Sequence, residues 1–585
     1  MNFLHNFDHI KPLSTILNNF MSYIISHTDY TKPLLQRLLD NRGIACACDD
    51  FLNPNMATYR HDPFLLNDMD IGTDRIIKAI KNKESICVFG DYDVDGVTSS
   101  FLLYTLLHDY LGHKAVKIMY PDRLADGYGL KVHHVDTIKT KWHDLIITVD
   151  NGITSIQEVM HAKNIGLDII ITDHHKALDV IPPADAIINP QVSPLYPFHG
   201  ICGAGVVLKL THALLKKSKL SPDVRQSILN HFIPIVAIAT VADCVPLINE
   251  NRALVKRWLA QINRREQILP SLAGMLDFLN IKGDISSFHI GFVIGPRINA
   301  AGRMGSGYDS LQTLLYTGEK QKSFLRDLDT INDERKRLQE EAAKVADTII
   351  DPEKNILIAM SPTFHEGIVG IVAGRITEKY HKPSVILHIS ETKGMAIGSL
   401  RWPDYFDVMA MMQWIQKESL WLGSIPDTGI LVRFGGHKQA WWLSVNLADI
   451  ELLKELLIKY TDTNISEVQS KKVLTLDTVI QAHEWNNKTL HEMTKLEPFG
   501  QGNQEPLFLL EDTNIVSIEK VGSKWQWHLK VNVDHQWNKL SALYRSKGDM
   551  TNNLSTDSHF PIIGKIKYDD YKGSYYIDGT LLTQS

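Results

Sequence analysis

Three aspartates, Asp91, Asp93 and Asp95, alternate along the stretch 90–96 (GDYDVDG), directly after the apolar run 86–89. Carboxylates this close together repel one another strongly unless a cation neutralises them. An acidic turn or a helix N-cap would also account for aspartates here, because Asp is common in both. The spacing therefore predicts either a metal site or a polar helix start, and the other acids of the chain decide between the two.

Further acids stand at the ends of apolar runs. Asp150 and Asp173 each follow a short, mostly apolar run, and Asp173 leads into His174 and His175. Asp243 ends a helix-like apolar stretch, where a buried carboxylate needs a partner. Two adjacent histidines alone are typical of a solvated turn or a helix cap. Beside so many acids at element ends, they indicate a site with mixed oxygen and nitrogen ligands.

Such a ligand set predicts divalent-cation chemistry. Oxygen ligands alone favour Mg²⁺ or Ca²⁺, and an added imidazole moves the expectation toward Mn²⁺. Several acids with one bridging carboxylate predict two ions about 3.5–4 Å apart, the geometry of in-line phosphoryl displacement. Water bound there becomes hydroxide near neutral pH, and the second ion stabilises the leaving oxygen. His175 would serve as a general acid or as an electrostatic stabiliser.

Cations and glycines predict the kind of substrate. The run 295–305 (GPRINAAGRMG) places two arginines in a glycine-flanked stretch that we expect to be flexible. The stretches 398–401 (GSLR) and 435–437 (GGH) would offer backbone N–H groups and cations to a phosphate. Glycine-rich turns with one arginine are common, so each stretch alone says little. Together with the acids they favour a phosphate-containing substrate.

Composition sets broad limits. A chain of 585 residues should divide into several domains. Lys+Arg 61 against Asp+Glu 67 gives a net charge of −6, so total charge predicts no nucleic-acid binding but leaves room for a local basic groove. Five cysteines without a C-x-x-C pair indicate reduced thiols in a cytoplasmic protein. We expect no secretory signal, and the apolar stretch 232–248, broken by Pro234, Asp243 and Pro246, should be a buried helix rather than a membrane span.

The acids must be positioned by regular elements, and these alternate between about residues 61 and 250. Helices are expected at 97–111, at 132–140 and from 153, and strands at 85–90, 115–120, 144–149, 167–172 and 186–188. This alternation is typical of a parallel sheet wrapped by helices. Ligands of such sheets bind outside the carboxyl ends of the strands, which is where the acids fall.

The rest of the chain changes character three times. Residues 1–60 form an amphipathic lead-in, and residues 251–350 are helical and highly charged, which predicts a long solvated helix joining two domains. Residues 351–462 return to alternating elements, and 463–585 have the short strands and turns of a small β-barrel. Its aromatics would either stack on bases or, more often in small barrels, fill the core: Trp525, Trp527, Trp537, Tyr544, Tyr568, Tyr571, Tyr575 and Tyr576. The predicted fold class is α/β with a terminal barrel.

Taken together, the motifs resemble a known family. Four stretches resemble, in order, the motifs of the DHH phosphoesterases: 90–96, 149–152 (VDNG), 173–175 (DHH) and 242–243 (AD). Three more are similar to the bacterial single-strand-specific DNA exonucleases of that class: 296–303, 365–375 and 496–503 (LEPFGQGN). The resemblance runs from about residue 60 to the end. It implies a DHH domain at 61–250, a helical connector at 251–350, a DHHA1 α/β domain at 351–462 and an OB-type barrel at 463–585.

The resemblance also implies an activity and its residues. It implies 5′-to-3′ degradation of single-stranded DNA to mononucleotides with two Mn²⁺ or Mg²⁺ ions, in DNA recombination and repair. Metal ligands would be Asp93, Asp95, Asp150, His174 and Asp243, with catalytic support from Asp91 and His175. DNA would be bound by Arg123, Arg303, Ser399, Arg401, Gly436 and His437. The implied partners are single-stranded DNA, a helicase and a single-strand-binding protein, with a monomeric enzyme and no membrane.

Three positions depart from the family's pattern, and two other functions compete. Phe89 stands where some relatives carry a metal-binding His, while Trp402 and the pair 441–442 replace small residues. The rivals are a DHH enzyme acting on oligoribonucleotides or a cyclic dinucleotide, and a non-catalytic scaffold in a replication or repair assembly. The terminal barrel and the chain length favour the exonuclease over the first. The complete set of acids favours an enzyme over the second, because like charges are costly to keep together.

Overall fold

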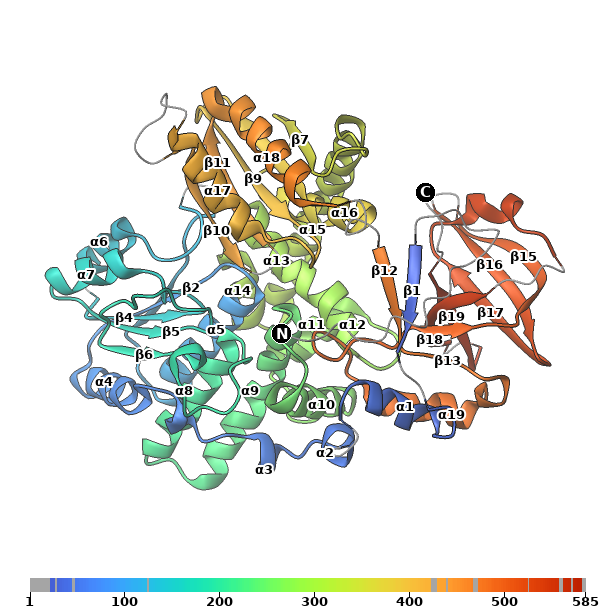
Figure 1. The fold of residues 1–585 in the computed structure, drawn as a ribbon. Coiled ribbons are helices and arrows are strands. Elements are labelled where there is room, and N and C mark those ends of the chain that lie inside the picture. Colours follow the sequence, from blue (N-terminus) through green and yellow to red (C-terminus); the bar gives the residue numbers. More distant parts are fainter. Residues whose placement is uncertain are drawn as a thin grey trace.

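The structure is a computed structural model. It describes residues 21–26, 29–44, 48–123, 126–141, 143–421, 429–437, 440–466, 472–523, 526–556, 561–569 and 572–580. Within these residues, strands form two five-stranded sheets, one seven-stranded sheet and one two-stranded pair. Figure 1 shows the three larger sheets as separate parts that surround a group of helices. The predicted α/β class with a C-terminal β part is confirmed.

The first five-stranded sheet is parallel, with the order β3-β2-β4-β5-β6. Its strands lie where the sequence predicts them: β2 (Ile86–Gly90), β3 (Val116–Met119), β4 (Leu145–Val149), β5 (Asp168–Thr172) and β6 (Ala186–Ile188). One face packs on α4 (Met69–Asn82), α5 (Val94–Thr105) and α8 (Gly203–Lys217), and the other on α6 (Val132–Thr140) and α7 (Ile156–Asn164). Burial on both faces explains the largely apolar runs, such as β4, whose residues are all buried.

Helix α9 (Pro222–Ala242) contains the first part of the apolar stretch 232–248. It is long and apolar enough to cross a membrane, but 61% of its most apolar window is buried inside the protein. Its residues join the core of the parallel sheet, including Phe232 and Ile235. The expected buried helix is therefore present, and it begins earlier than the sequence indicated.

Six helices follow, in the order α10 (Asn249–Asn263), α11 (Pro270–Leu279), α12 (Ser287–His289), α13 (Gly295–Met304), α14 (Gly307–Leu315) and α15 (Gly318–Ile349). The long connecting helix is confirmed as the 32-residue α15. The expectation of a flexible run at 295–305 is wrong, because most of it forms α13. Gly302 serves close packing rather than mobility, since a Cβ there would lie 2.3 Å from the carbonyl oxygen of Tyr92.

The second five-stranded sheet is mixed, with the order β10-β11-β9-β8-β7. Its strands are β7 (Leu357–Ser361), β8 (Ser384–Ser390), β9 (Met395–Arg401), β10 (Leu431–His437) and β11 (Ala440–Asn446). Helix α16 (Val369–Tyr380) covers one face, and α17 (Val408–Trp421) and α18 (Ile450–Asn464) cover the other. Of the three tryptophans that replace the family's small residues, Trp402 and Trp441 are buried in the core between this sheet and its helices, which explains why large apolar side chains fit there.

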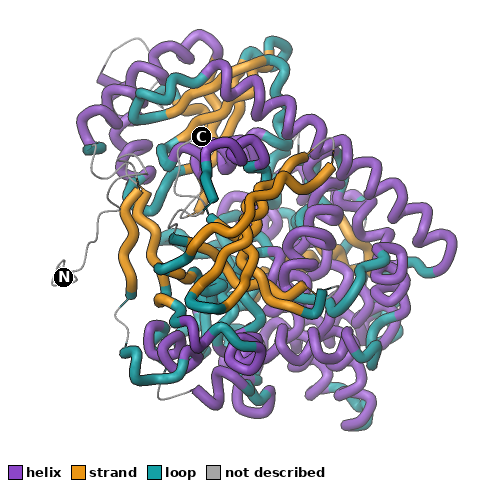
Figure 2. Tube along the Cα trace, turned by 90° about the vertical axis from the view of Figure 1, so that its right-hand side faces the viewer, coloured by secondary structure: helices purple, strands orange, loops and turns teal. Residues whose placement is uncertain are grey.

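The C-terminal sheet has seven strands, in the order β13-β14-β18-β19-β17-β16-β15. They are β13 (Thr478–Val479), β14 (Phe508–Leu510), β15 (Asn514–Ser523), β16 (Gln526–His535), β17 (Asn538–Tyr544), β18 (Ile562–Asp569) and β19 (Ser574–Gly579). In the side view of Figure 2 these strands lie in front, below the mixed sheet. Tyr544 is buried in the core, whereas Trp527, Trp537 and Tyr568 are exposed. Trp525 and Tyr571 lie outside the described residues.

The N-terminal part of the chain belongs structurally to the C-terminal sheet. Strand β1 (Met21–Ile25) pairs in parallel with β12 (Lys472–Leu476), and α1 (Leu34–Asn41) packs in the C-terminal core. The buried guanidinium of Arg37 donates to both carboxylate oxygens of Glu484, at 2.7 and 2.8 Å. The sequence predicted an amphipathic lead-in but not the surface that it covers.

Candidate active site

The acidic stretch forms the turn between β2 and α5. Asp93 is the N-cap of α5, and its Oδ1 accepts a hydrogen bond from the Gly96 N–H at 3.0 Å. Gly96 is required because a Cβ there would lie 2.3 Å from the carbonyl oxygen of Asp91. The two interpretations of this stretch are thus compatible, since capping occupies Asp93 while Asp91 and Asp95 are turned inward and buried.

Asp95 is held by the start of a second helix. Its two carboxylate oxygens accept hydrogen bonds from the N–H groups of Gly203 (2.6 Å) and Ala204 (2.7 Å), the first residues of α8. The positive end of the helix dipole favours a carboxylate in this position. A Cβ on Gly203 would lie 2.8 Å from that of Asp150, so the same glycine brings Asp150 beside Asp95.

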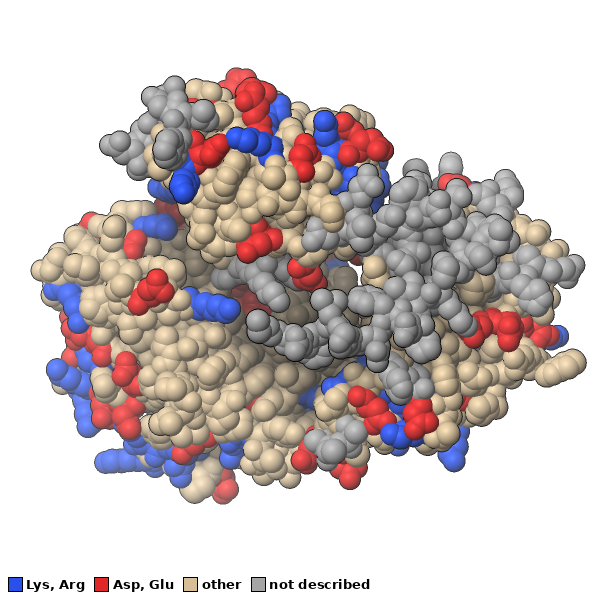
Figure 3. Space-filling view, in the orientation of Figure 1, with Lys and Arg blue, Asp and Glu red and all other residues tan. Residues whose placement is uncertain are grey.

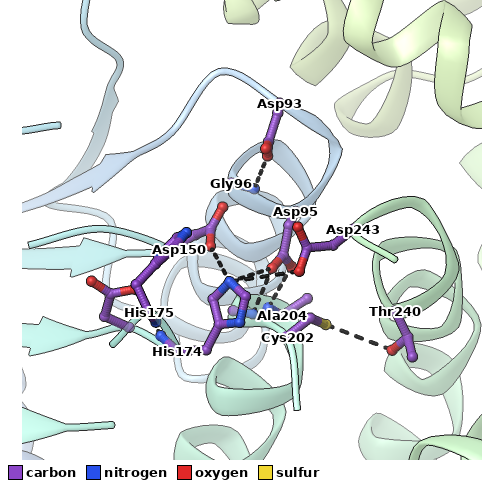
Figure 4. Close-up of polar contacts among 12 residues, drawn as sticks. Asp93, Asp95, Gly96, Asp150, His174, His175, Cys202, Ala204, Thr240 and Asp243 are labelled. Atoms are coloured by element: carbon purple, nitrogen blue, oxygen red, sulfur yellow. Dashed lines mark hydrogen bonds and ion pairs between the residues drawn. The ribbon is translucent and has the colours of Figure 1, made fainter. Parts of the chain in front are cut away.

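Carboxylates from three elements meet at one imidazole. The Nε2 atom of His174 lies 3.1 Å from Asp150 Oδ1, 3.6 Å from Asp243 Oδ2 and 3.7 Å from Asp95 Oδ2. Figure 4 shows the three carboxylates grouped around the His174 ring. Asp150 follows β4, Asp95 lies in α5 and Asp243 ends α9, so this contact depends on the complete fold of the first domain.

The donor atoms fit divalent cations at two neighbouring positions. The ligand atoms of Asp95, His174 and Asp243 lie within 4.8 Å of one another, and so do those of Asp91, Asp93 and Asp150. Asp91 Oδ1 is buried and has no hydrogen-bond partner among the described residues, as expected of an oxygen that coordinates a metal ion. All five residues predicted to bind metal are brought together, and Asp91 lies among them.

The electrostatics of the cluster call for a cation. Burial, and next the charge of Asp93, raise the pKa of Asp91 to about 8 and that of Asp95 to about 6. Burial and the neighbouring acids, first Asp95, also raise the pKa of Asp150 and of Asp243 well above the ordinary value. Without a positive charge, these carboxyl groups cannot all ionise at neutral pH.

Asp173 positions the second histidine. Its Oδ1 accepts hydrogen bonds from the N–H groups of His174 (2.7 Å) and His175 (3.1 Å) and lies 2.7 Å from His175 Nδ1. Its Oδ2 accepts from the Ile153 N–H at 3.0 Å. Burial alone would lower the pKa of His175, but the charge and hydrogen bond of Asp173 outweigh it and raise the pKa to about 9. The imidazole is therefore protonated at pH 7 in this arrangement.

Sequence reasoning assigned no role to three residues that support the site. Asp173 is the first; its place in the DHH triplet was the available signal. Tyr128 donates its hydroxyl to the Asp150 carbonyl oxygen at 3.1 Å, and Asn299 Oδ1 accepts from the Val94 N–H at 3.0 Å. Each bond spans elements distant in sequence, so only the fold reveals these two.

The cations predicted to bind DNA lie beside the acids. Arg123 stacks over the Tyr92 ring, 5.0 Å from its centre. Burial, with the charges of Arg123 and Arg335, lowers the pKa of Arg303 to about 9, and the charges of Asp93 and Arg401 also act on this group. A half-buried cation among other cations marks a place where an anion is stabilised.

Arg401 and Ser399 lie together on the mixed sheet. Arg401 Nη1 donates to Ser399 Oγ at 2.5 Å, and Ser399 Oγ donates to the Trp441 carbonyl oxygen at 3.0 Å. A Cβ on Gly370, in the first turn of α16, would lie 3.0 Å from Arg401 Nη2. Figure 3 shows the surface hollowed between the mixed-sheet part at the top and the parallel-sheet part below it, with basic side chains beside the hollow.

The expectation that backbone N–H groups at 398–401 contact a phosphate is wrong. Strand β9 lies inside the sheet, paired with β8 on one side and β11 on the other, so its backbone is used by the ladders. Gly436 is required by close packing, because a Cβ there would lie 2.1 Å from the Ala440 carbonyl oxygen. Of His437 the structure describes the backbone, at the end of β10.

Phe89 supplies no ligand from the position where some relatives have a His. It is fully buried in β2 and packs against His134, with ring centres 5.1 Å apart. The position is filled by the core between the sheet and α6.

Comparisons with known proteins agree with this architecture. Residues 85–240 match the family described as "DHH family, N-terminal domain", and residues 476–580 match the "RecJ OB domain". The fold and the acid cluster therefore define a protein of the DHH class. The single-stranded-DNA-specific exonuclease RecJ of Salmonella typhimurium is 31% identical over 524 residues, which cover 86% of each chain. The chain belongs to the RecJ family.

Two further relatives complete the comparison. RecJ of Bacillus subtilis is 30% identical over 550 residues, and the chain spans 66% of the length of that protein, just under two thirds. The structure of Thermus thermophilus RecJ in complex with Mn²⁺ has a TM-score of 0.77 at 24% identity and covers 96% of this chain and 78% of that chain. At this identity the structural likeness shows the fold, from the parallel sheet to the C-terminal part.

Proposed function

We propose that the protein is a single-stranded-DNA-specific exonuclease that removes mononucleotides from the 5′ end by two-metal hydrolysis with Mn²⁺ or Mg²⁺. The observation that carries the proposal is the meeting of Asp95, Asp150 and Asp243 at His174, beside Asp91 and Asp93. The names of the RecJ relatives supply the substrate and the specificity for single strands.

The described residues divide the work among them. Asp93, Asp95, Asp150, His174 and Asp243 would hold the two ions, with Asp91 beside them. Divalent ions in this position supply a hydroxide nucleophile and neutralise charge on the leaving oxygen.

Other residues would donate a proton to the leaving oxygen and bind the phosphates of the DNA. His175 is kept protonated by Asp173 and would give its Nε2 proton to the leaving oxygen. Phosphate contacts would come from six residues of α13, of the mixed sheet and of the segment after β3: Arg123, Arg303, Ser399, Arg401, Gly436 and His437.

The organisation of the chain supports action on a polymer. We assign the DHH domain to residues 61–250, the connector to 251–350, the DHHA1 domain to 351–462 and the OB-type domain to 463–585. Exposed Trp527, Trp537 and Tyr568 on the C-terminal part offer stacking surfaces that a mononucleotide substrate would not need. The proposal includes a cytoplasmic monomer that meets a helicase and a single-strand-binding protein during DNA recombination and repair.

The test is digestion of 5′-labelled and 3′-labelled single strands beside their duplex forms, with Mn²⁺ and with EDTA. The expected result is metal-dependent release of labelled mononucleotide from the 5′ end, with the duplex spared. Cleavage of oligoribonucleotides or cyclic dinucleotides but of no DNA would overturn the substrate assignment. Inactivity toward all of these, with partner binding that survives EDTA, would identify a scaffold.

A further inference from the structure

One face of the mixed sheet carries Ser399 and Arg401 and continues onto β10 and β11. In the sheet register, Ser399 is paired with Trp442 of β11, and Trp442 is paired with Gly435 of β10. Directly paired residues of antiparallel strands point to the same face, and so do residues two apart on one strand. The indole of Trp442 therefore lies on the same face as Ser399 and Arg401, beside them.

The two neighbouring tryptophans of β11 have opposite environments. Trp441 points to the other face, where it is 7% exposed and stacks near Phe434, with ring centres 6.0 Å apart. Trp442 is 42% exposed. Packing of the sheet explains the first indole but not the second, because a large exposed apolar ring brings little stability.

The surroundings of Trp442 suit a flat, negatively charged ligand. Its partner Gly435 has no side chain, and a Cβ placed there would lie 3.6 Å from the indole nitrogen. Arg433, two residues earlier on β10 and paired with Ser444 of β11, is exposed on the same face. An accessible ring thus lies between a cation on β10 and the Ser399–Arg401 pair on β9.

This face also connects to the metal cluster. Helix α13 lies against the acidic turn, since a Cβ on Gly302 would lie 2.3 Å from the Tyr92 carbonyl oxygen, and the charges of Arg401 and Asp93 both act on Arg303 of this helix. The segment that leads into α16 fixes this arrangement, since a Cβ on Gly367 would lie 2.0 Å from the Arg303 carbonyl oxygen. A strand with its scissile phosphate at the acids would have its terminal nucleotide at the mixed sheet.

We propose that Trp442 is a base-stacking residue for the 5′-terminal nucleotide, whose phosphate is held by Ser399 and Arg401. The inference rests on the proposed function and adds a binding subsite to it. Stacking on an indole is available to every base, because each has a π-face, so the subsite accepts all sequences but requires a base. Loss of such a contact weakens binding by about 5- to 100-fold.

The experiment compares 5′-phosphorylated single strands that carry either a normal or an abasic 5′-terminal nucleotide. The wild-type enzyme should have a KM about 5- to 100-fold higher for the abasic strand. Trp442→Ala should raise KM for the normal strand by the same factor, leave kcat within about twofold and bind both strands equally. Trp442→Phe should restore the preference, because a phenyl ring still stacks.

A matched control is Trp527→Ala, which removes an indole of similar exposure, 41%, from the C-terminal sheet. Any change in KM that Trp527→Ala causes should be equal for the normal and the abasic strand. Should Trp442→Ala fail to fold, the fluorescence of a 5′-terminal 2-aminopurine bound in Ca²⁺ provides the second measurement. The wild type and Trp442→Phe should both quench it by stacking, the phenylalanine variant less.

Three results have distinct meanings. A wild-type enzyme that cleaves both strands with equal KM would overturn the stacking inference while leaving the proposed function intact. An equal rise in KM for both strands in Trp442→Ala would also overturn it, because the indole would then act on something other than the base. A wild type that cleaves neither strand would refute the proposed function itself.

Discussion

The substitution Asp150→Asn is the sharpest test of the metal cluster, because the backbone should tolerate it. Asp150 has a φ of 63°, in the left-handed region, where asparagine is as acceptable as aspartate. Its N–H donates to the Thr172 carbonyl oxygen at 3.0 Å, a bond that the change retains. Asparagine also has nearly the same volume, so the change removes the ionisable carboxyl group without leaving a cavity.

The magnitude follows from the pKa shifts of the cluster. A carboxyl group whose folded pKa lies above its unfolded value destabilises the folded state at any pH above that unfolded value. For Asp95, a pKa of about 6 against 3.8 corresponds to a cost of about 3 kcal/mol at pH 7. The pKa of Asp150 is raised in the same direction, first by burial and then by Asp95. Without metal, Asp150→Asn should therefore increase the free energy of unfolding.

With metal bound, the wild type should instead be more stable than Asp150→Asn. Mn²⁺ at 1,000 times its Kd stabilises the wild type by about 4 kcal/mol, and a variant without the Asp150 carboxylate should gain much less. Thermal unfolding in EDTA and in Mn²⁺, with cleavage of single-stranded DNA measured on the same samples, tests both halves. We expect a variant that is more stable than the wild type in EDTA, less stable in Mn²⁺, and inactive. Asp549→Asn, at a side chain 98% exposed, is the control and should match the wild type. Retained cleavage, or a variant less stable in both conditions, would refute the reasoning.

Three other predictions concern separate parts of the molecule. Arg401→Ala should weaken binding of single-stranded DNA and lower the slope of log K against log salt by about 1, and an unchanged slope would exclude a phosphate contact. Arg252→Met should lower the free energy of unfolding by about 2–5 kcal/mol, measured by denaturant unfolding, and should make the C-terminal part more susceptible to limited proteolysis. The reason is that the buried guanidinium of Arg252, in α10, donates to the carbonyl oxygens of Phe51 and Glu497, which both belong to the part that packs with the C-terminal core. In EDTA, the stability contributed by His175 should be complete below pH 6.5 and lost as the pH rises through about 9, because its folded pKa is raised. Asp173→Asn should remove this pH dependence, and an unaltered pH profile would contradict the pairing.

The parallel sheet and its acids were predictable because local signals and fold agree there. Runs such as 145–149 are apolar except for one buried threonine because both faces of the sheet are covered, and an acid follows at the carboxyl end. The position of each strand followed from this pattern. The grouping of Asp95, Asp150 and Asp243 followed from strand-end geometry together with the family motifs.

Other features depend on contacts that no local pattern carries. Gly302 looks like a flexible residue in sequence, but it is a contact point between α13 and the acidic turn. The stretch 398–401 looks like a phosphate loop, yet β8 and β11 occupy its backbone. Tyr128 and Asn299 support the site through hydrogen bonds to residues 22 and 205 positions away in the sequence. The position of Trp442 beside Ser399 follows only from the register of three strands.

The pairing of β1 with β12, and of Arg37 with Glu484 across 447 residues, has a consequence for biosynthesis. Strand β1 and helix α1 are synthesised before the residues that they pack against, so α1 stays without this core while the parallel-sheet part is made. A fragment beginning near residue 476 would bury Glu484 without its arginine and lack Leu34 and Leu38. Residues 21–41 and the C-terminal sheet therefore reach their folded state together, once residues 472–580 have been synthesised.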